Sequence, residues 1–323
     1  MLSRSLRSSL SLTEVGLGAA QLGNLFHETT DEDASATVDA AWDAGIRYFD
    51  TAPHYGLGLS ERRLGAALAA RPRDEFVLST KVGRLLVPSG SPEGVMDDEG
   101  FAVPATLRRE WDLSRDGIRR SIVESLERLG LDRIDIAYLH DPDEFGEQAH
   151  AEAIPALIEL RDEGVVGAVG AGMNQSAMPA EFVRRHDVDV IMLAGRYTLI
   201  EQGALDDLLP LAEERGVGIV AAAVYNSGLL AQPRPPADAT YDYAQAPTEL
   251  LARANALADV CEEFGVSLPE AAIAYPLRHP AVVSVAVGMR TAEQVTETVR
   301  RYGTSIPDEF WTALRERGLV RDA

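Results

Sequence analysis

Four polar residues near the ends of three strand-like segments could perform acid–base chemistry together. Asp50 and Tyr55 follow the first of these segments, Lys81 ends the next, and His140 ends the third. A phenol with an ordinary pKa of about 10 becomes a usable proton donor and acceptor near neutral pH when a cation lies close. In such a cluster Lys81 would supply the charge, Asp50 would hold Lys81 in place, and His140 would hydrogen-bond the reacting oxygen.

Lysine usage singles out one member of this group. Lys81 is the single lysine among 30 basic residues, and the other 29 are arginine. Lysine is a compact ammonium whose pKa can be shifted, whereas arginine is a planar fork that stays protonated, so the retained lysine is one that arginine does not replace. Plainer alternatives remain on the residues alone. The lysine could be there by chance, His140 could be a core histidine, and residues 50–56 could form a corner that caps the next helix.

Composition limits the class of protein. The chain has 323 residues, of which 46% are hydrophobic, enough for one barrel-sized domain or two smaller ones. A net charge of −21 and a pI near 4.7 argue against a nucleic acid or an anionic membrane as partner. A lone cysteine, Cys261, fits a reducing compartment, and no apolar run reaches the length of a membrane helix. We therefore expect a cytoplasmic protein that acts on a small molecule, of undetermined oligomeric state.

Strand-like and helical patterns alternate along the chain. Strands are expected at Val15–Ala20, Ile46–Thr51, Phe76–Val82, Ile134–His140, Val165–Gly172, Val188–Gly195, Gly218–Tyr225 and Val282–Gly288. Helices are expected at Asp31–Ala44, Ser114–Leu129 (with Gly130 as C-cap), Ala149–Glu163, Leu205–Arg215 and Thr291–Tyr302, the last opening with a capping-box pattern. This alternation favours a (β/α)₈ barrel, which we expect to form a single domain over residues 1–323 with an additional C-terminal helix at 307–318.

The alternative architecture is a doubly wound sheet. Gly56-Leu57-Gly58 with Gly65 weakly resembles a dinucleotide-binding motif, but no glycine-rich turn follows the first strand and no strand with a terminal acid follows at the proper distance. In a barrel the strand ends converge, so polar residues far apart in the sequence meet. Segments 83–110 and 226–247 follow strands on that face, and we expect them to be irregular substrate loops.

The chain resembles the aldo-keto reductase family nearly end to end. The most specific matches are Asp50-Thr51-Ala52-Pro53-His54-Tyr55-Gly56, Ser79-Thr80-Lys81 and Tyr138-Leu139-His140, which contain the family's catalytic Asp, Tyr, Lys and His. The resemblance implies that Tyr55 is the acid or base and that a nicotinamide cofactor binds across the C-terminal mouth of the barrel. It implies no Rossmann domain and no metal.

The resemblance also implies a set of cofactor-binding residues. Those near the nicotinamide are Met173 and Asn174, for the carboxamide, Tyr225, for stacking on the ring, and Asn226 beside it. Those near the adenosine phosphate are Gly288, Met289, Arg290 and Gln294. Several of these positions depart from the family pattern, because Met173 replaces a serine, Ala194 a glutamine, Gly288 a lysine and Gln294 an arginine.

The departures bear on cofactor choice and substrate. With Arg290 as the remaining basic residue of the phosphate loop, NAD is expected to serve at least as well as NADP. The runs 194–199 and 225–230 resemble the branch of sugar 1-dehydrogenases that act on L-fucose and D-threo-aldoses, and pyridoxal 4-dehydrogenase is similar too. The implied reaction is oxidation of an aldose to a lactone, with carbonyl reduction in reverse. Alternatives are oxidation of pyridoxal, general aldehyde reduction, or a cofactor-sensing regulatory subunit of an ion channel.

Overall fold

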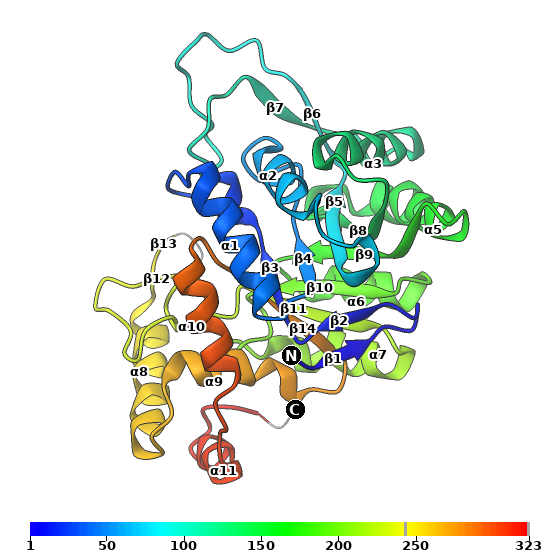
Figure 1. Cartoon of the computed structure of the whole chain (residues 1–323). Coiled ribbons are helices and arrows are strands. Elements are labelled where there is room, and N and C mark those ends of the chain that lie inside the picture. Colours follow the sequence, from blue (N-terminus) through cyan, green and yellow to red (C-terminus); the bar gives the residue numbers. More distant parts are fainter. Residues whose placement is uncertain (242–243, 322–323) are drawn as a thin grey trace.

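Eight parallel strands close into a barrel with helices around it (Figure 1). The structure is a computed structural model that describes residues 1–241 and 244–321. The barrel strands are β3 (Val15–Gly18), β4 (Tyr48–Asp50), β5 (Val77–Val82), β8 (Ile134–His140), β9 (Val166–Met173), β10 (Val190–Ala194), β11 (Gly218–Ala222) and β14 (Val282–Gly288). Each pairs with the next in sequence, and β14 pairs with β3 to close the circle. The predicted (β/α)₈ barrel is confirmed.

Helices connect successive strands. They are α1 (Asp31–Asp43), α2 (Leu59–Leu68), α3 (Arg115–Leu129), α4 (Gly146–Gln148), α5 (Ile154–Asp162), α6 (Ala177–Arg185), α7 (Leu208–Arg215), α8 (Thr248–Glu263), α9 (Leu268–Ala274), α10 (Ala292–Tyr302) and α11 (Asp308–Glu316). The last of these is the expected C-terminal helix. Within residues 1–241 and 244–321, none of the helices is long and apolar enough to cross a membrane.

Two predicted helix caps can be compared with the structure. Ser114 Oγ accepts from the backbone N–H of Gly117 at 3.1 Å at the start of α3, as expected. At α10 the expected capping box is incomplete. Thr291 accepts from the N–H of Gln294, but the Gln294 side chain accepts from the N–H of Arg290, one residue before the cap. The difference ties Gln294 to the preceding loop.

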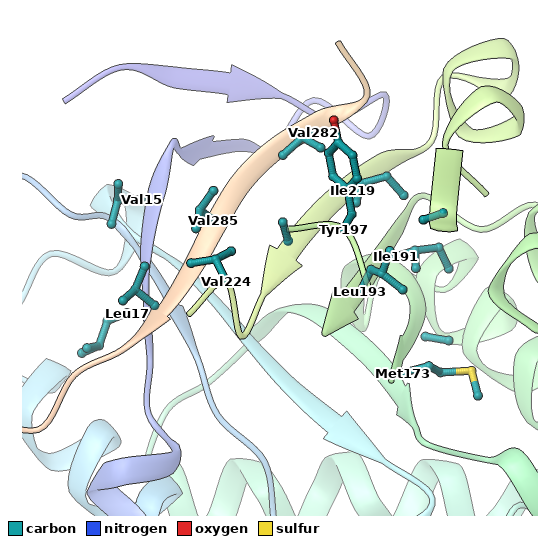
Figure 2. Close-up of a cluster of buried hydrophobic side chains, with 14 of the residues drawn as sticks. Val15, Leu17, Met173, Ile191, Leu193, Tyr197, Ile219, Val224, Val282 and Val285 are labelled. Atoms are coloured by element: carbon teal, nitrogen blue, oxygen red, sulfur yellow. The ribbon is translucent and has the colours of Figure 1, made fainter. Parts of the chain in front are cut away.

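The core has two layers because side chains alternate along each strand. On β10, Ile191 and Leu193 face the surrounding helices, in the cluster that Figure 2 shows in part. Met192, between them, faces the barrel interior. The N-terminal hairpin of β1 (Ser3–Ser5) and β2 (Ser11–Thr13) adds buried leucines to that interior cluster and closes the end where the strands begin. The candidate site lies at the other end of the barrel, where the strands finish.

The insertion at 83–110 is more regular than expected. Its ends pair as an antiparallel hairpin, β6 (Arg84–Pro88) with β7 (Leu107–Trp111) (Figure 1, cyan). The sequence did not predict this pairing because the strands are separated by a long connection rather than a tight turn. The connection crosses to the loop after β3, where Phe26 N–H donates to Gly100 O at 2.8 Å. In the second insertion β12 (Thr240–Tyr241) pairs with β13 (Ala244–Gln245), and residues 242–243 lie outside the described residues.

Candidate active site

Three neighbouring barrel strands each direct two polar side chains inward. The pairs are Tyr48 and Asp50 on β4, Ser79 and Lys81 on β5, and Tyr138 and His140 on β8. Residues two apart on a strand face the same side, so the second member of each pair reaches the C-terminal mouth. There a cavity of about 720 Å³ is lined by all four predicted catalytic residues, Tyr55 among them. Its volume is within the range of small-molecule and cofactor sites.

A buried ion pair lies at the base of the cavity. Lys81 Nζ donates to Asp50 Oδ2 at 2.7 Å and to Thr51 O at 3.0 Å, and the Lys81 side chain is only 3% exposed. Burial disfavours the charge, but Asp50 and Tyr55 together outweigh it, so the pKa of Lys81 is raised and the ammonium stays protonated. Ser79 Oγ donates to Asp50 Oδ1 at 2.7 Å and thereby fixes the second carboxylate oxygen.

A close backbone contact positions Tyr55. Gly56, the next residue, has a φ of +61°, and a Cβ there would lie 2.2 Å from the carbonyl oxygen of Gly23. The tight loop between β4 and α2 thus packs directly on the turn after β3 and places the Tyr55 ring centroid 4.7 Å from Lys81 Nζ. Burial raises the pKa of Tyr55, and Lys81 acts in the opposite direction. The net direction differs from the lowered pKa expected from the sequence, because burial exceeds the effect of a lysine already paired with Asp50.

Two imidazoles lie beside the phenol. The His140 ring centroid is 6.0 Å from that of Tyr55 and 5.5 Å from that of His54. Burial and then the charges of Arg84 and Lys81 hold the pKa of His140 well below its usual range. Burial and Arg84 likewise lower the pKa of His54 to about 2. Both rings are therefore neutral, and His140 can donate a hydrogen bond to a substrate oxygen through an N–H.

The opposite wall of the cavity consists of small residues. They are Gly18, Ala19, Ala20, Ala194, Ala222, Ala223, Ala286 and Gly288. Such a wall leaves room for a flat ring, and Met173 with Asn174, both predicted cofactor residues, lie at its edge. The absence of a large side chain at Ala194, noted in the sequence as a departure, contributes to this space.

Gln21 is a lining residue that the sequence did not predict. Its amide oxygen is buried and has no hydrogen-bond partner among the described residues. A Cβ on Gly288 would lie 2.5 Å from Gln21 Nε2, so the glycine makes room for this amide. A free acceptor beside a small-residue cradle fits a nicotinamide cofactor, whose ribose hydroxyls are donors. The sequence signal for Gln21 was only its position directly after the first barrel strand.

Five of the eight predicted cofactor residues do not line the cavity, among them Tyr225, Asn226 and Met289. The Tyr225 hydroxyl accepts from Arg301 Nη1 at 3.1 Å, which directs the ring toward α10. Asn226 is 3% exposed and its amide donates to Gly195 O at 3.3 Å, while its buried amide oxygen has no partner within residues 1–241 and 244–321. Met289 is 1% exposed within the main core. Where β11 ends, alanines form the wall in place of an aromatic ring.

Arg290 and Gln294 also lie away from the cavity lining. The Arg290 guanidinium donates to the carbonyl oxygens of Leu25 and His27 and to Thr29 Oγ1, at 2.5–2.7 Å. Burial lowers the pKa of Arg290. The one arginine of the predicted phosphate loop is thus bonded to the loop between β3 and α1.

Comparison with known proteins gives consistent results. The model of the Aldo/keto reductase family matches residues 14–317. D-threo-aldose 1-dehydrogenase of a Pseudomonas species is 52% identical over 316 residues, covering 97% of this chain and 96% of that protein. Pyridoxal 4-dehydrogenase of Microbacterium luteolum is 41% identical over 335 residues, with 97% and 96% covered. The holo form of an aldo-keto reductase from Bacillus halodurans superposes with a TM-score of 0.78 at 28% identity, covering 100% of this chain and 97% of that structure.

Proposed function

The chain belongs to the aldo/keto reductase family and is an NAD(P)-dependent oxidoreductase, and from this we propose that it oxidises the anomeric carbon of an aldose to a lactone. The observation that carries the proposal is the buried Lys81–Asp50 pair directly beside the Tyr55 ring, at the base of a cavity with a cradle for a cofactor. The 52% identity to a D-threo-aldose 1-dehydrogenase supports an aldose as substrate.

In the oxidative direction Tyr55 accepts the proton of the anomeric hydroxyl while the C1–H bond breaks and the C1=O bond of the lactone forms. Lys81 stabilises the negative charge of the phenol oxygen before that proton arrives, and Asp50 keeps the ammonium in position. Neutral His140 donates a hydrogen bond to the reacting oxygen and orients it. When bound, the oxidised nicotinamide cofactor supplies the hydride acceptor. In reduction Tyr55 returns the proton to the carbonyl oxygen.

The test is a substrate panel with the purified protein. L-fucose, D-threo-aldoses, pyridoxal and simple aldehydes are incubated with NAD or NADP, and absorbance of the reduced cofactor and lactone formation are followed. We expect lactone formation from aldoses at a higher kcat/KM than oxidation of pyridoxal. Oxidation of pyridoxal without any aldose turnover would favour a second candidate function, oxidation of pyridoxal, which the 41% identity to pyridoxal 4-dehydrogenase supports. Absence of turnover with every compound would favour a regulatory subunit.

Cofactor choice follows from the position of Arg290. Binding of the 2′-phosphate of NADP requires cations free to bond it, preferably bidentately. Arg290 is already bonded to three acceptors of the β3–α1 loop, and the protein carries a net charge of −21. We therefore expect kcat/KM for NAD to equal or exceed that for NADP. A preference for NADP above about tenfold, equivalent to about 1.4 kcal/mol, would contradict this reading.

The Arg290→Ala substitution tests whether Arg290 holds the β3–α1 loop in place or binds the 2′-phosphate of NADP. If the side chain ties the loop after β3, the substitution weakens NADH and NADPH binding by a similar factor, because it loosens a shared wall. If it clamps the 2′-phosphate, only NADPH binding falls. Fluorescence titration of both reduced cofactors measures the difference. Arg300→Ala, on the exposed face of α10 with Glu297 and Glu270 as partners, is the matched control.

The rates of aldose oxidation and aldehyde reduction should depend differently on pH. Burial raises the pKa of Tyr55 above its ordinary value of about 10, so below that pH the phenol is mostly protonated and the small unprotonated fraction that can accept a proton grows as pH rises. Between about pH 7 and pH 9 we therefore expect kcat/KM for aldose oxidation to increase and that for aldehyde reduction, which uses the protonated phenol, to stay nearly constant. Parallel pH profiles in both directions measure this, and oxidation that slows as pH rises would contradict Tyr55 as the proton acceptor.

A further inference from the structure

Two carboxylates line the outer end of the cavity and come from different parts of the fold. Glu99 is supplied by the connection between β6 and β7, and Asp141 directly follows β8. Arg84 lies between them, with Nη2 at 3.3 Å from Asp141 Oδ2 and Nη1 at 3.9 Å from Glu99 Oε2. Its guanidinium also stacks on Trp111, 4.6 Å from the ring centroid. Arg84 is thus fixed and holds both carboxylates at the mouth.

The neighbouring Asp97–Arg109 ion pair is a purely structural contact and serves for comparison. Both oxygens of Asp97 accept from Arg109, and the two side chains are only 3% and 6% exposed. Arg109 also donates to His54 O at 2.8 Å, which ties the insertion to the catalytic loop. The Glu99 carboxylate differs. It is 46% exposed, and its contacts with Arg84, Arg109 and His54 are 3.7–3.9 Å, longer than hydrogen bonds.

From this geometry we propose that Glu99 and Asp141 bind hydroxyl groups of the sugar and select a neutral, polyhydroxylated substrate. The inference rests on the proposed function and deepens it. A carboxylate offers about four lone-pair sites, and a sugar hydroxyl is a donor that can occupy one of them. Each carboxylate keeps acceptor capacity beyond its contact with Arg84.

The positions assign different hydroxyls to the two carboxylates. Asp141 Oδ2 is 3.6 Å from His140 Nε2, the ring that contacts the reacting oxygen. A hydroxyl on the adjacent carbon, C2, is therefore within reach of Asp141. Glu99 Oε2 is 3.7 Å from His54 Nδ1, and the His54 ring centroid is 5.5 Å from that of His140, so Glu99 is assigned to a hydroxyl further along the sugar. Phe101, whose ring centroid is 5.2 Å from that of His54, provides an apolar wall for the C–H face.

The negative charge of the two carboxylates disfavours anionic substrates. Burial raises the pKa of Asp141 to about 6, with Arg84 opposing it, so the carboxylate is charged above that pH. Together with Glu99 it disfavours sugar phosphates and uronates, which would bring a second negative charge into the same end of the cavity.

The test compares three substrates across four proteins. An aldose, its 2-deoxy analogue and a simple aldehyde without hydroxyl groups are assayed with the wild type, Asp141→Asn, Glu99→Gln and Asp98→Asn. Asp98 is the exposed neighbour of Glu99 and does not line the cavity, so it is the matched control. Because charge-assisted hydrogen bonds are about twice as strong as neutral ones, each active-site substitution should cost about tenfold where its hydroxyl is present.

The expected pattern separates the two positions. Asp141→Asn lowers kcat/KM for the aldose about tenfold more than kcat/KM for the 2-deoxy sugar or the simple aldehyde. Glu99→Gln lowers kcat/KM for the two sugars about equally, and about tenfold more than kcat/KM for the simple aldehyde. An equal loss of kcat/KM on all three substrates in Asp141→Asn would mean that Asp141 acts only through His140. If the ratios of kcat/KM between the substrates are the same in both variants as in the wild type, both assignments are wrong.

Failure of the proposed function gives a different result. If the wild type oxidises no aldose, sugar binding is still measured as competitive inhibition of aldehyde reduction. The hydroxyl dependence of the inhibition constant then tests Glu99 and Asp141 independently of lactone formation. Loss of discrimination between the aldose and the 2-deoxy sugar in Asp141→Asn would support the inference, and equal inhibition of the wild type by both sugars would overturn it.

Discussion

Replacing Tyr55 with phenylalanine is expected to lower kcat by about 10²–10⁴-fold in both directions, the range attributed to general acid–base groups. The substitution keeps the ring that faces Lys81 and removes only the hydroxyl that exchanges the proton. The cofactor cradle is formed by other residues, so NADH binding should remain within about twofold. Steady-state kinetics and NADH fluorescence titration measure the two quantities separately.

Tyr302→Phe is the matched control for this prediction. Its hydroxyl donates to Glu14 at 2.6 Å, remote from the cavity lining, so the same chemical change should leave kcat unaltered. A Tyr55→Phe enzyme with near-normal kcat would remove the phenol from the mechanism. Loss of NADH binding in parallel with kcat would instead indicate a structural role for the hydroxyl.

Lys81→Arg should also abolish most activity despite keeping the charge. The lysine is almost fully buried, and its single nitrogen lies 2.7 Å from Asp50 Oδ2 and 3.0 Å from Thr51 O, a position that a wider planar guanidinium does not match. Arginine would displace the charge from Tyr55 and from Asp50. We expect a fall in kcat comparable to that of Tyr55→Phe, measured together with the thermal unfolding midpoint so that misfolding is recognised.

Amine chemistry provides a second test of the same residue. Lys81 is the single lysine, so acetylation can react only there or at the N-terminal amine. Lys81 is buried and its pKa is raised by its neighbours, so acetylation should react first at the exposed N-terminal amine without loss of activity. Inactivation should follow only the slower modification of Lys81, and cofactor should slow it further. Arg120→Lys, at an exposed site on α3, is the control for the arginine–lysine exchange. A fully active Lys81→Arg enzyme would mean that the lysine is retained by chance.

The barrel and the catalytic group could be predicted because they depend on short-range patterns. Strand runs ending in Asp50, Lys81 and His140 reveal both the strand positions and the polar ends, and parallel strand order then brings those ends together. The supporting contact from Ser79 to Asp50 is less visible, since serine within a strand has many ordinary roles.

Side chains after irregular turns were harder to predict. The strand expected to continue to Tyr225 ends at Ala222, and Ala223, Asn226 and Ser227 all adopt positive φ. These turns direct Tyr225 toward α10, which no periodicity indicates. Arg290 was recognised as the remaining cation of its loop, but its three acceptors lie near the start of the chain and are visible only in the fold.

The outer part of the cavity also depends on contacts between residues that are far apart in the sequence. Glu99 reaches the site through the β6–β7 hairpin, whose strands were not predicted, and Gln21 meets Gly288 from the opposite end of the sequence. A single sequence contains no signal for either contact, because each is determined by how distant segments pack.

The most direct test of the account is the fate of the hydrogen on C1. The purified enzyme is given NAD and an aldose carrying deuterium at the anomeric carbon, and the reduced cofactor and the sugar product are analysed by mass spectrometry. The account predicts one deuterium in the reduced cofactor for each lactone formed, with loss of the signal in Tyr55→Phe. Reduced cofactor without deuterium would show that hydride leaves another carbon and would contradict oxidation at C1.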